Sequence, residues 1–248
     1  GDINNDGLTD IYFTGNQVSD KLYLNKGDMK FEDITEKAIG EKAKEGWRTG
    51  VVMVDINNDG WLDIYVSRSG APANKDLMAN LLYVNNGDNT FSEKAFEYGI
   101  DIKKNTTQSA FFDFDNDGDL DLYVMNHLHN KVNQGANYPA NLTAMQEAFD
   151  QFSDVLLENV DGKYIDISKK AGINNFTFGL GLAIADLNDD GYEDIYVSND
   201  YSAPDFMYIN QKNGTFKDEI LYRTQHISNF SMGNDIADFN NDQLPDII

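Results

Sequence analysis

The chain has no cysteine, only four prolines and three histidines, and 19 basic residues against 42 acidic ones. The absence of cysteine excludes disulfides and thiolate-bound metals. No apolar run approaches the roughly 20 residues of a membrane-spanning helix, so we expect no membrane span in this fragment. The formal net charge of −23 argues against a nucleic-acid partner, because a phosphate backbone requires basic patches.

The acidity is concentrated in a nine-residue pattern, D-x-[DN]-x-D-G-x-x-D, that occurs four times, and a fifth time with Gln243 in place of the glycine. Positions 1, 3, 5 and 9 carry oxygen-bearing side chains, and position 7 can offer its backbone carbonyl. The candidate ligands, in chain order, are Asp2, Asn4, Asp6, Leu8 and Asp10; Asp55, Asn57, Asp59, Trp61 and Asp63; Asp113, Asp115, Asp117, Asp119 and Asp121; Asp186, Asn188, Asp190, Tyr192 and Asp194; Asp238, Asn240, Asp242, Leu244 and Asp246.

Carboxylates packed this closely repel one another unless a cation neutralises them. Calcium takes six to eight oxygen ligands, whereas magnesium demands near-ideal octahedral geometry and keeps its waters. The pattern therefore predicts four to five Ca²⁺ sites. Nineteen of the 42 acidic residues lie in the five loops, and five bound ions would bring the formal charge to about −13. We expect the fifth site to be weaker, because Gln243 replaces glycine and Pro245 follows.

Two other kinds of loop share part of this pattern. An EF-hand needs a bidentate Glu at position 12 between two helices, but that position holds Phe13, Val66, Val124 and Val197, and β-branched or aromatic runs flank the loops. Turns rich in Asp, Asn and Gly form without any metal, yet five copies with one ligand register favour metal loops.

The spacing of the loops predicts an all-β fold made of propeller blades. The loops start 53, 58, 73 and 52 residues apart, which suits four-stranded blades with the loop between the first two strands. We predict one propeller fragment over residues 1–248. Its blade repeats lie near 1–45, 46–100, 101–173, 174–227 and 228–248, with an insertion over 126–152 that carries a short helix.

These residues give the chain a family resemblance. Calcium-type loops between blade strands, with Gly70-Ala71-Pro72 and Ser202-Ala203-Pro204 beyond them, resemble the FG-GAP or VCBS repeats of integrin-α-like β-propellers. The run 230–242 looks like the subset related to cartilage acidic protein and associated with ASPIC/UnbV segments. The resemblance implies adhesion or ligand recognition on a propeller face. It also implies a ring usually of seven blades, of which we expect about four to four and a half here.

We expect an exported, non-enzymatic module that acts outside the cytosol, at a cell surface or in a periplasm, and of bacterial type. Weak calcium loops suit such compartments, where calcium is near millimolar. The expected partner is an unidentified protein or glycan. The alternatives are a carbohydrate-binding or accessory propeller of a polysaccharide-active enzyme, and a purely structural spacer. A glycosidase pair is disfavoured because a catalytic pair does not repeat in every blade.

Two further pairs of residues could have either a binding role or an ordinary structural role. His127 and His129 could ligate zinc, but no third His or Cys is near, so solvated loop histidines are expected. Trp47 and Arg48 could stack on a sugar, but we expect a tryptophan packed at a blade edge.

Overall fold

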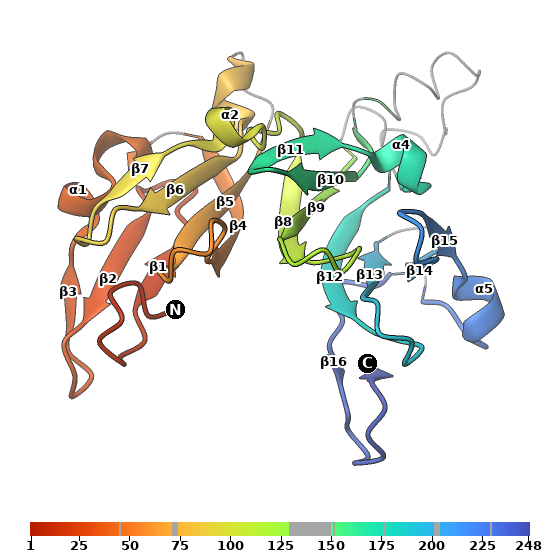
Figure 1. Ribbon diagram of the computed structural model, residues 1–248. Coiled ribbons are helices and arrows are strands. Elements are labelled where there is room, and N and C mark those ends of the chain that lie inside the picture. The colour runs from red at the N-terminus through yellow and green to blue at the C-terminus, as the bar shows by residue number, and fades with distance from the viewer. Residues whose placement is uncertain are drawn as a thin grey trace. The chain divides into compact units, whose positions relative to one another are not determined.

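The computed structural model describes residues 1–44, 46–70, 74–128, 150, 152–175, 177–200, 204–228 and 230–248. Figure 1 shows that β-strands dominate these residues. The strands are β1 (Ile11–Phe13), β2 (Lys21–Asn25), β3 (Phe31–Asp33), β4 (Trp47–Val54), β5 (Asp63–Ser69), β6 (Leu81–Asn85), β7 (Phe91–Glu93), β8 (Thr106–Phe112), β9 (Asp121–Asn126), β10 (Val155–Val160), β11 (Lys163–Asp166), β12 (Gly179–Ala185), β13 (Asp194–Asn199), β14 (Phe206–Asn210), β15 (Phe216–Asp218), β16 (Ile236–Ala237) and β17 (Asp246–Ile247).

The helices are single turns that follow the last strand of a sheet or connect strands. They are α1 (Thr35–Ala38), α2 (Ala95–Tyr98), α4 (Ser168–Ala171) and α5 (Ile220–Arg223), with the 3₁₀ helices η1 (Gly40–Lys44) and η2 (Lys75–Met78). Within the described ranges, no helix is long and apolar enough to cross a membrane.

Strands that follow one another in the chain are neighbours in the sheets. The sheets have the orders β1-β2-β3, β4-β5-β6-β7, β8-β9-β10-β11, β12-β13-β14-β15 and β16-β17. The pairings with a defined register are antiparallel, for example Ile64 opposite Tyr83 and Ile195 opposite Tyr208. The predicted fold class, an all-β propeller fragment built from four-stranded blades, is therefore confirmed.

Each acidic loop occupies the predicted place in its sheet. Loops 55–63, 113–121, 186–194 and 238–246 connect the first strand to the second, and loop 2–10 leads directly into β1. In the three four-stranded sheets the strand that leaves the loop is central, and these strands, β5, β9 and β13, are buried almost throughout. This burial explains why runs such as Ile64-Tyr65-Val66 show no polar alternation.

The chain divides into two compact units, 1–106 with 161–163 and 107–160 with 164–248. In the first unit, the core joins Tyr12 and Leu22 of the first sheet to Ile64 and Tyr83 of the second. In the second unit, Tyr123 belongs to one cluster with residues of the β12–β15 sheet. Within each unit, a blade buries its apolar face against the neighbouring blade.

Several predicted features lie outside the described residues. These are most of the insertion with its expected helix, His129, and parts of both Gly-Ala-Pro-type elements. His127 does lie in the described part, where its ring packs edge-on against Phe178 with centroids 5.3 Å apart. The expectation of a packed Trp47 was wrong: the side chain, at the very start of β4, is 50% exposed.

A buried tyrosine–carboxylate pair closes the end of the central strand that lies opposite the acidic loop. The hydroxyl of Tyr123 donates to Asp154 Oδ2 at 2.7 Å, and the N–H of Asn126 donates to Asp154 Oδ1 at 2.7 Å. Equivalent pairs are Tyr12–Asp20 at 2.7 Å and Tyr196–Asp205 at 3.0 Å. Burial, followed by the charge of Asp154, raises the pKa of Tyr123 well above its usual range, so this hydroxyl remains a donor.

The next blade supplies a further donor to each of these carboxylates. Arg48 Nε lies 3.0 Å from Asp20 Oδ2, Asn175 Nδ2 donates to Asp154 at 2.7 Å, and Ser231 Oγ donates to Asp205 at 2.8 Å. Arg48 is buried, so it is an interblade ion-pair residue and not a sugar-stacking one. In the second blade a neutral Asn80 replaces the aspartate and donates to both Tyr65 and Thr106.

We predict that Asp154→Ala lowers the free energy of unfolding by about 2–4 kcal/mol, because it leaves buried donors without an acceptor. Asp154→Asn should cost less, since Asn80 already serves at the equivalent place. Urea unfolding followed by circular dichroism measures both, with Asp76→Ala as a surface control. Equal losses in the Asp154→Ala and control variants would contradict the role of the pair.

Candidate metal centres

The five loops share one pattern of hydrogen bonds from backbone to side chain. The position-1 carboxylate accepts the N–H of position 5 at 3.0–3.2 Å and that of position 6 at 2.7–3.0 Å. Position 5 accepts the N–H of position 7 through Oδ1 at 2.9–3.0 Å. These bonds fix the backbone at position 7, whose carbonyl is a predicted ligand, and leave Oδ2 of position 5 for other partners.

Two residues of each loop adopt the left-handed conformation. Position 6 has φ between +71° and +95°, with glycine in four loops and Gln243 in the fifth. Position 4 has φ between +56° and +61° and holds Asn, or Asp189 in the fourth loop. The sequence pattern identified the glycine but treated position 4 as free. The signal was present, because Asn and Asp tolerate this conformation better than other side chains do.

Position 9 carries the most buried carboxylate of each loop, although Asp246 of the fifth loop is only partly buried. Asp10, Asp63, Asp121 and Asp194 are at most 2% exposed. Oδ2 accepts the N–H of position 2 at 2.9–3.1 Å, and in these four loops Oδ1 accepts an asparagine N–H at the end of β2, β6, β10 or β14 at 2.7–2.8 Å. The aspartate therefore joins the loop to the next two strands of its blade.

The pKa of Asp186, at position 1, and the pKa values of Asp63 and Asp121, at position 9, are shifted in opposite directions. Burial raises the pKa of Asp63 to about 6 and that of Asp121 to about 7. At position 1 of the fourth loop, partial burial opposes the charge of Asp186, but the backbone donors outweigh it and the pKa is lowered. Asp186 is thus stabilised as an anion by the backbone, whereas burial disfavours the charged forms of Asp63, Asp121 and Asp194 unless a cation lies close.

The structure brings only part of the predicted ligand set together. Carboxylate oxygens of Asp113, Asp115 and Asp117 lie within 4.8 Å of one another, while both oxygens of Asp121 accept backbone N–H groups. In the fourth loop, Oδ1 of Asn188 is buried and has no hydrogen-bond partner. An oxygen-only set with an unpaired acceptor fits a hard divalent cation such as calcium.

Side-chain amides connect the loops of neighbouring blades. In the first unit, Asn5 Nδ2 donates to the Gly60 carbonyl at 2.9 Å and Asn85 Nδ2 to the Ile3 carbonyl at 2.8 Å. In the second unit, Asn116 donates to Gly191 at 3.0 Å and Asn210 to Phe114 at 2.7 Å. The sequence analysis missed these contacts, although the asparagine recurs where each second strand of the sequence repeat ends.

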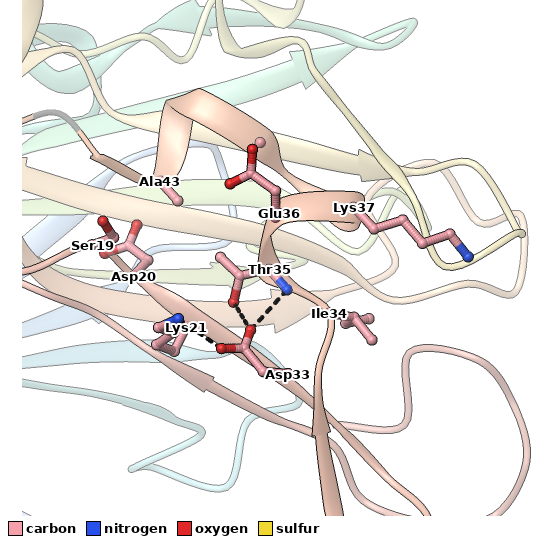
Figure 2. Close-up of a pocket in the computed structure, with 10 residues that line it drawn as sticks. Ser19, Asp20, Lys21, Asp33, Ile34, Thr35, Glu36, Lys37 and Ala43 are labelled. Carbon is pink, nitrogen blue, oxygen red and sulfur yellow. Dashed lines mark hydrogen bonds and ion pairs between the residues drawn. The ribbon is translucent and has the colours of Figure 1, made fainter.

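A separate pocket of about 410 Å³ lies beside α1 and η1 in the first unit. Figure 2 shows Asp33 between Lys21 and Thr35, with an ion pair of 2.6 Å to Lys21 Nζ and hydrogen bonds from the Thr35 hydroxyl and N–H. Lys21, followed by Thr35, lowers the pKa of Asp33 to about 2. None of the lining residues belongs to an acidic loop or is aromatic.

The repeat that these loops define matches a known family. The model of the FG-GAP-like repeat matches residues 2–66, 71–124 and 186–248. The chain belongs to the FG-GAP-like repeat family. Strands, not helices, flank the loops, which excludes the EF-hand interpretation.

Similar FG-GAP-like chains include cartilage acidic protein 1 from three vertebrates. The identity is 24% to the Mus musculus protein over 83% of this chain, 28% to the Xenopus tropicalis protein over 80%, and 24% to the Homo sapiens protein over 100%. These alignments cover 31%, 28% and 38% of the relatives, so the chain spans about a third of their length. The predicted resemblance to this subset is confirmed.

A solved structure with a similar fold is that of an Agrocybe aegerita lectin, described with its specific recognition of non-reducing terminal N-acetylglucosamine. The TM-score is 0.53 at 18% identity, and the match covers 99% of this chain and 58% of the lectin chain. At this identity the likeness shows a shared fold.

The fifth loop tests the cost of a side chain at position 6. Gln243 has φ +71°, and the loop keeps the N–H bonds to positions 1 and 5 and to Oδ2 of position 9 that the other four loops have. Because a non-glycine residue costs about 1 kcal/mol there, we predict that Gln243→Gly tightens calcium binding at this loop roughly fivefold. Titration followed by the amide signals of the loop in nuclear magnetic resonance spectra measures the change.

Gly60→Gln is the reciprocal variant, because a Cβ at Gly60 meets nothing within 4 Å and only the backbone cost remains. It should weaken the second site by a similar factor. A fifth loop that fills together with the others in the unmodified chain would contradict the predicted weakness.

Proposed function

We propose that the chain is a calcium-binding FG-GAP scaffold in which each acidic loop holds one Ca²⁺. The observation that carries the proposal is the repetition of one oxygen arrangement in five loops, with Asp113, Asp115 and Asp117 converging and Asn188 Oδ1 left without a donor. The ligands would be the side chains at positions 1, 3, 5 and 9 with the carbonyl of position 7.

The role of the ion would be structural. Its charge would offset the repulsion among the loop carboxylates and the cost of burying position 9, so that binding free energy becomes folding free energy. Neighbouring loops exchange amide–carbonyl bonds through Asn5, Asn85, Asn116 and Asn210. A metal that orders one loop would therefore also support the adjacent blade.

On this scaffold we propose recognition of a protein or glycan without catalysis. The loop carboxylates recur in every blade and are engaged by backbone donors, whereas a catalytic pair needs one unrepeated site with carboxyl groups set for chemistry. An extracellular setting, where millimolar calcium would fill weak sites, is part of the same proposal. The relatives are vertebrate proteins, so a bacterial or periplasmic origin has no support from them.

Calorimetric titration of chelator-stripped protein tests the calcium proposal. We predict uptake of four to five Ca²⁺ per chain, and no comparable uptake of magnesium. The double variant Asp115→Asn/Asp117→Asn should lose one site, while Asp161→Asn, in the exposed turn between β10 and β11, should lose none. A folded chain that takes up no calcium would refute the proposal.

Glycan binding is the second candidate, favoured by the shared fold with the Agrocybe aegerita lectin. A glycan array probed in calcium buffer tests it, with glycans ending in N-acetylglucosamine as the first comparison. We expect any glycan signal to be lost in chelator. The pocket beside α1 has no aromatic wall on which a sugar ring could stack, so Lys21→Ala in that pocket should leave a signal unchanged.

A further inference from the structure

The fourth loop has a cation of its own. Lys212, in the turn between β14 and β15, places Nζ 2.9 Å from the main-chain carbonyl oxygen of Asp190 and 3.4 Å from Asp190 Oδ2. The same nitrogen lies 5.2 Å from the centre of the Tyr192 ring. Asp190 and Tyr192 are positions 5 and 7 of the loop, both of them predicted ligands. The ammonium group therefore contacts the predicted metal site directly.

The corresponding place in the first two blades is glycine. The N–H groups of Gly27, Gly87 and Lys212 each donate to the asparagine that ends the preceding strand, at 2.9 Å in all three blades. Their φ values are +78°, +76° and +59°. A lysine thus occupies a left-handed position that glycine adopts without strain. The left-handed turn favours glycine, so the turn does not explain why a lysine is found here. The contacts of Lys212 with the fourth loop do explain it.

The oxygen that Lys212 approaches is the one facing the other ligands. In the first loop, Oδ2 of Asp6 accepts the position-3 amide of Asn4 at 3.0 Å, and in the second, Oδ2 of Asp59 accepts that of Asn57 at 2.9 Å. In the fourth loop Oδ1 of Asp190 is taken by the Tyr192 N–H at 3.0 Å, and Oδ2 lies toward Lys212. The position-3 oxygen, Asn188 Oδ1, is buried without a donor.

We propose that Lys212 is a built-in competitor for the fourth calcium site, so that this site binds calcium more weakly than the second site and fills later. The inference rests on the proposed calcium function. The ammonium group neutralises part of the loop charge in the calcium-free chain and repels the incoming ion. Because the lysine side chain is 45% exposed, it moves aside when calcium enters, and salt weakens its effect. The fourth loop is thereby suited to sense calcium in a higher range than its neighbours.

The test is a calcium titration of the full chain, followed site by site through the amide signals of Gly60 and Gly191 in nuclear magnetic resonance spectra. Lys212→Gln removes the charge and keeps a side chain at the same backbone position. We expect it to tighten binding at the fourth loop about three- to tenfold, and less so at high salt, without changing the second loop. An unchanged Gly191 titration would overturn the inference.

The chain offers a matched control and a reciprocal variant. Lys217 makes the same kinds of contact away from any loop, 2.9 Å from Glu219 Oε1 and 5.7 Å from the Tyr222 ring centre, so Lys217→Gln should leave the fourth loop unchanged. Gly87→Lys places a lysine beside Trp61 of the second loop, where a Cβ lies 3.4 Å from the ring, and should weaken the second site.

The outcomes separate the two claims. If calcium binds to the Lys212→Gln chain and to the unmodified chain with equal strength, the role of Lys212 is refuted. The proposed calcium binding is then still supported. If calcium shifts neither the Gly60 nor the Gly191 signal in any variant, both the role of Lys212 and the proposed calcium binding are refuted.

Discussion

A buried carboxylate at the start of the central strand is the constraint on which each four-stranded blade depends. Asp63 is fully buried, yet both of its oxygens accept backbone N–H groups, one from the loop and one from Asn85 on the next strand. These bonds set the register between loop and sheet. They do not remove the cost of a charge without a nearby countercharge. The same loop gathers further oxygens close by, and the proposed calcium ion would supply the missing countercharge near this carboxylate.

The second unit shows that a central strand is held at both ends. β9 begins at Asp121, bonded to Phe114 and Asn159, and ends at Asn126, whose N–H donates to Asp154. One carboxylate belongs to the acidic loop, and the other accepts a tyrosine hydroxyl and an amide from the following repeat. Only Asp121 lies in a loop with other candidate oxygen ligands. The blade thus keeps its candidate metal ligands at one end of the central strand and, at the other end, a carboxylate that accepts tyrosine and amide donors.

The local parts of this architecture could be predicted from the sequence. The loop pattern, the strands around it and the four-stranded blade follow from residue spacing, because each lies within one stretch of chain. Gly60 and Asp63 were recognisable for the same reason. What could not be predicted were pairings between distant residues, such as Arg48 with Asp20 or Asn210 with Phe114. Such pairs depend on how one blade meets the next, which no periodicity encodes.

Lys212 and Trp47 illustrate the two ways in which local patterns fell short. The sequence pattern did not single out Lys212, and only the folded hairpin places its ammonium group near Tyr192 and Asp190. Trp47 looked like a packing residue, yet it starts its strand half exposed. In both cases the side chain's surroundings come from a neighbouring strand or loop. The position-9 aspartates were easier to recognise, because the position-2 donor lies seven residues before the aspartate in every loop.

The most direct test of the account is the melting temperature of the chain as a function of free calcium. If metal binding supplies folding free energy, the melting temperature rises steadily with the logarithm of the calcium concentration. Each site would contribute about 4 kcal/mol at a thousandfold excess over its dissociation constant. The account predicts this rise with calcium and little with magnesium. A melting temperature that is the same in chelator and in millimolar calcium would contradict it.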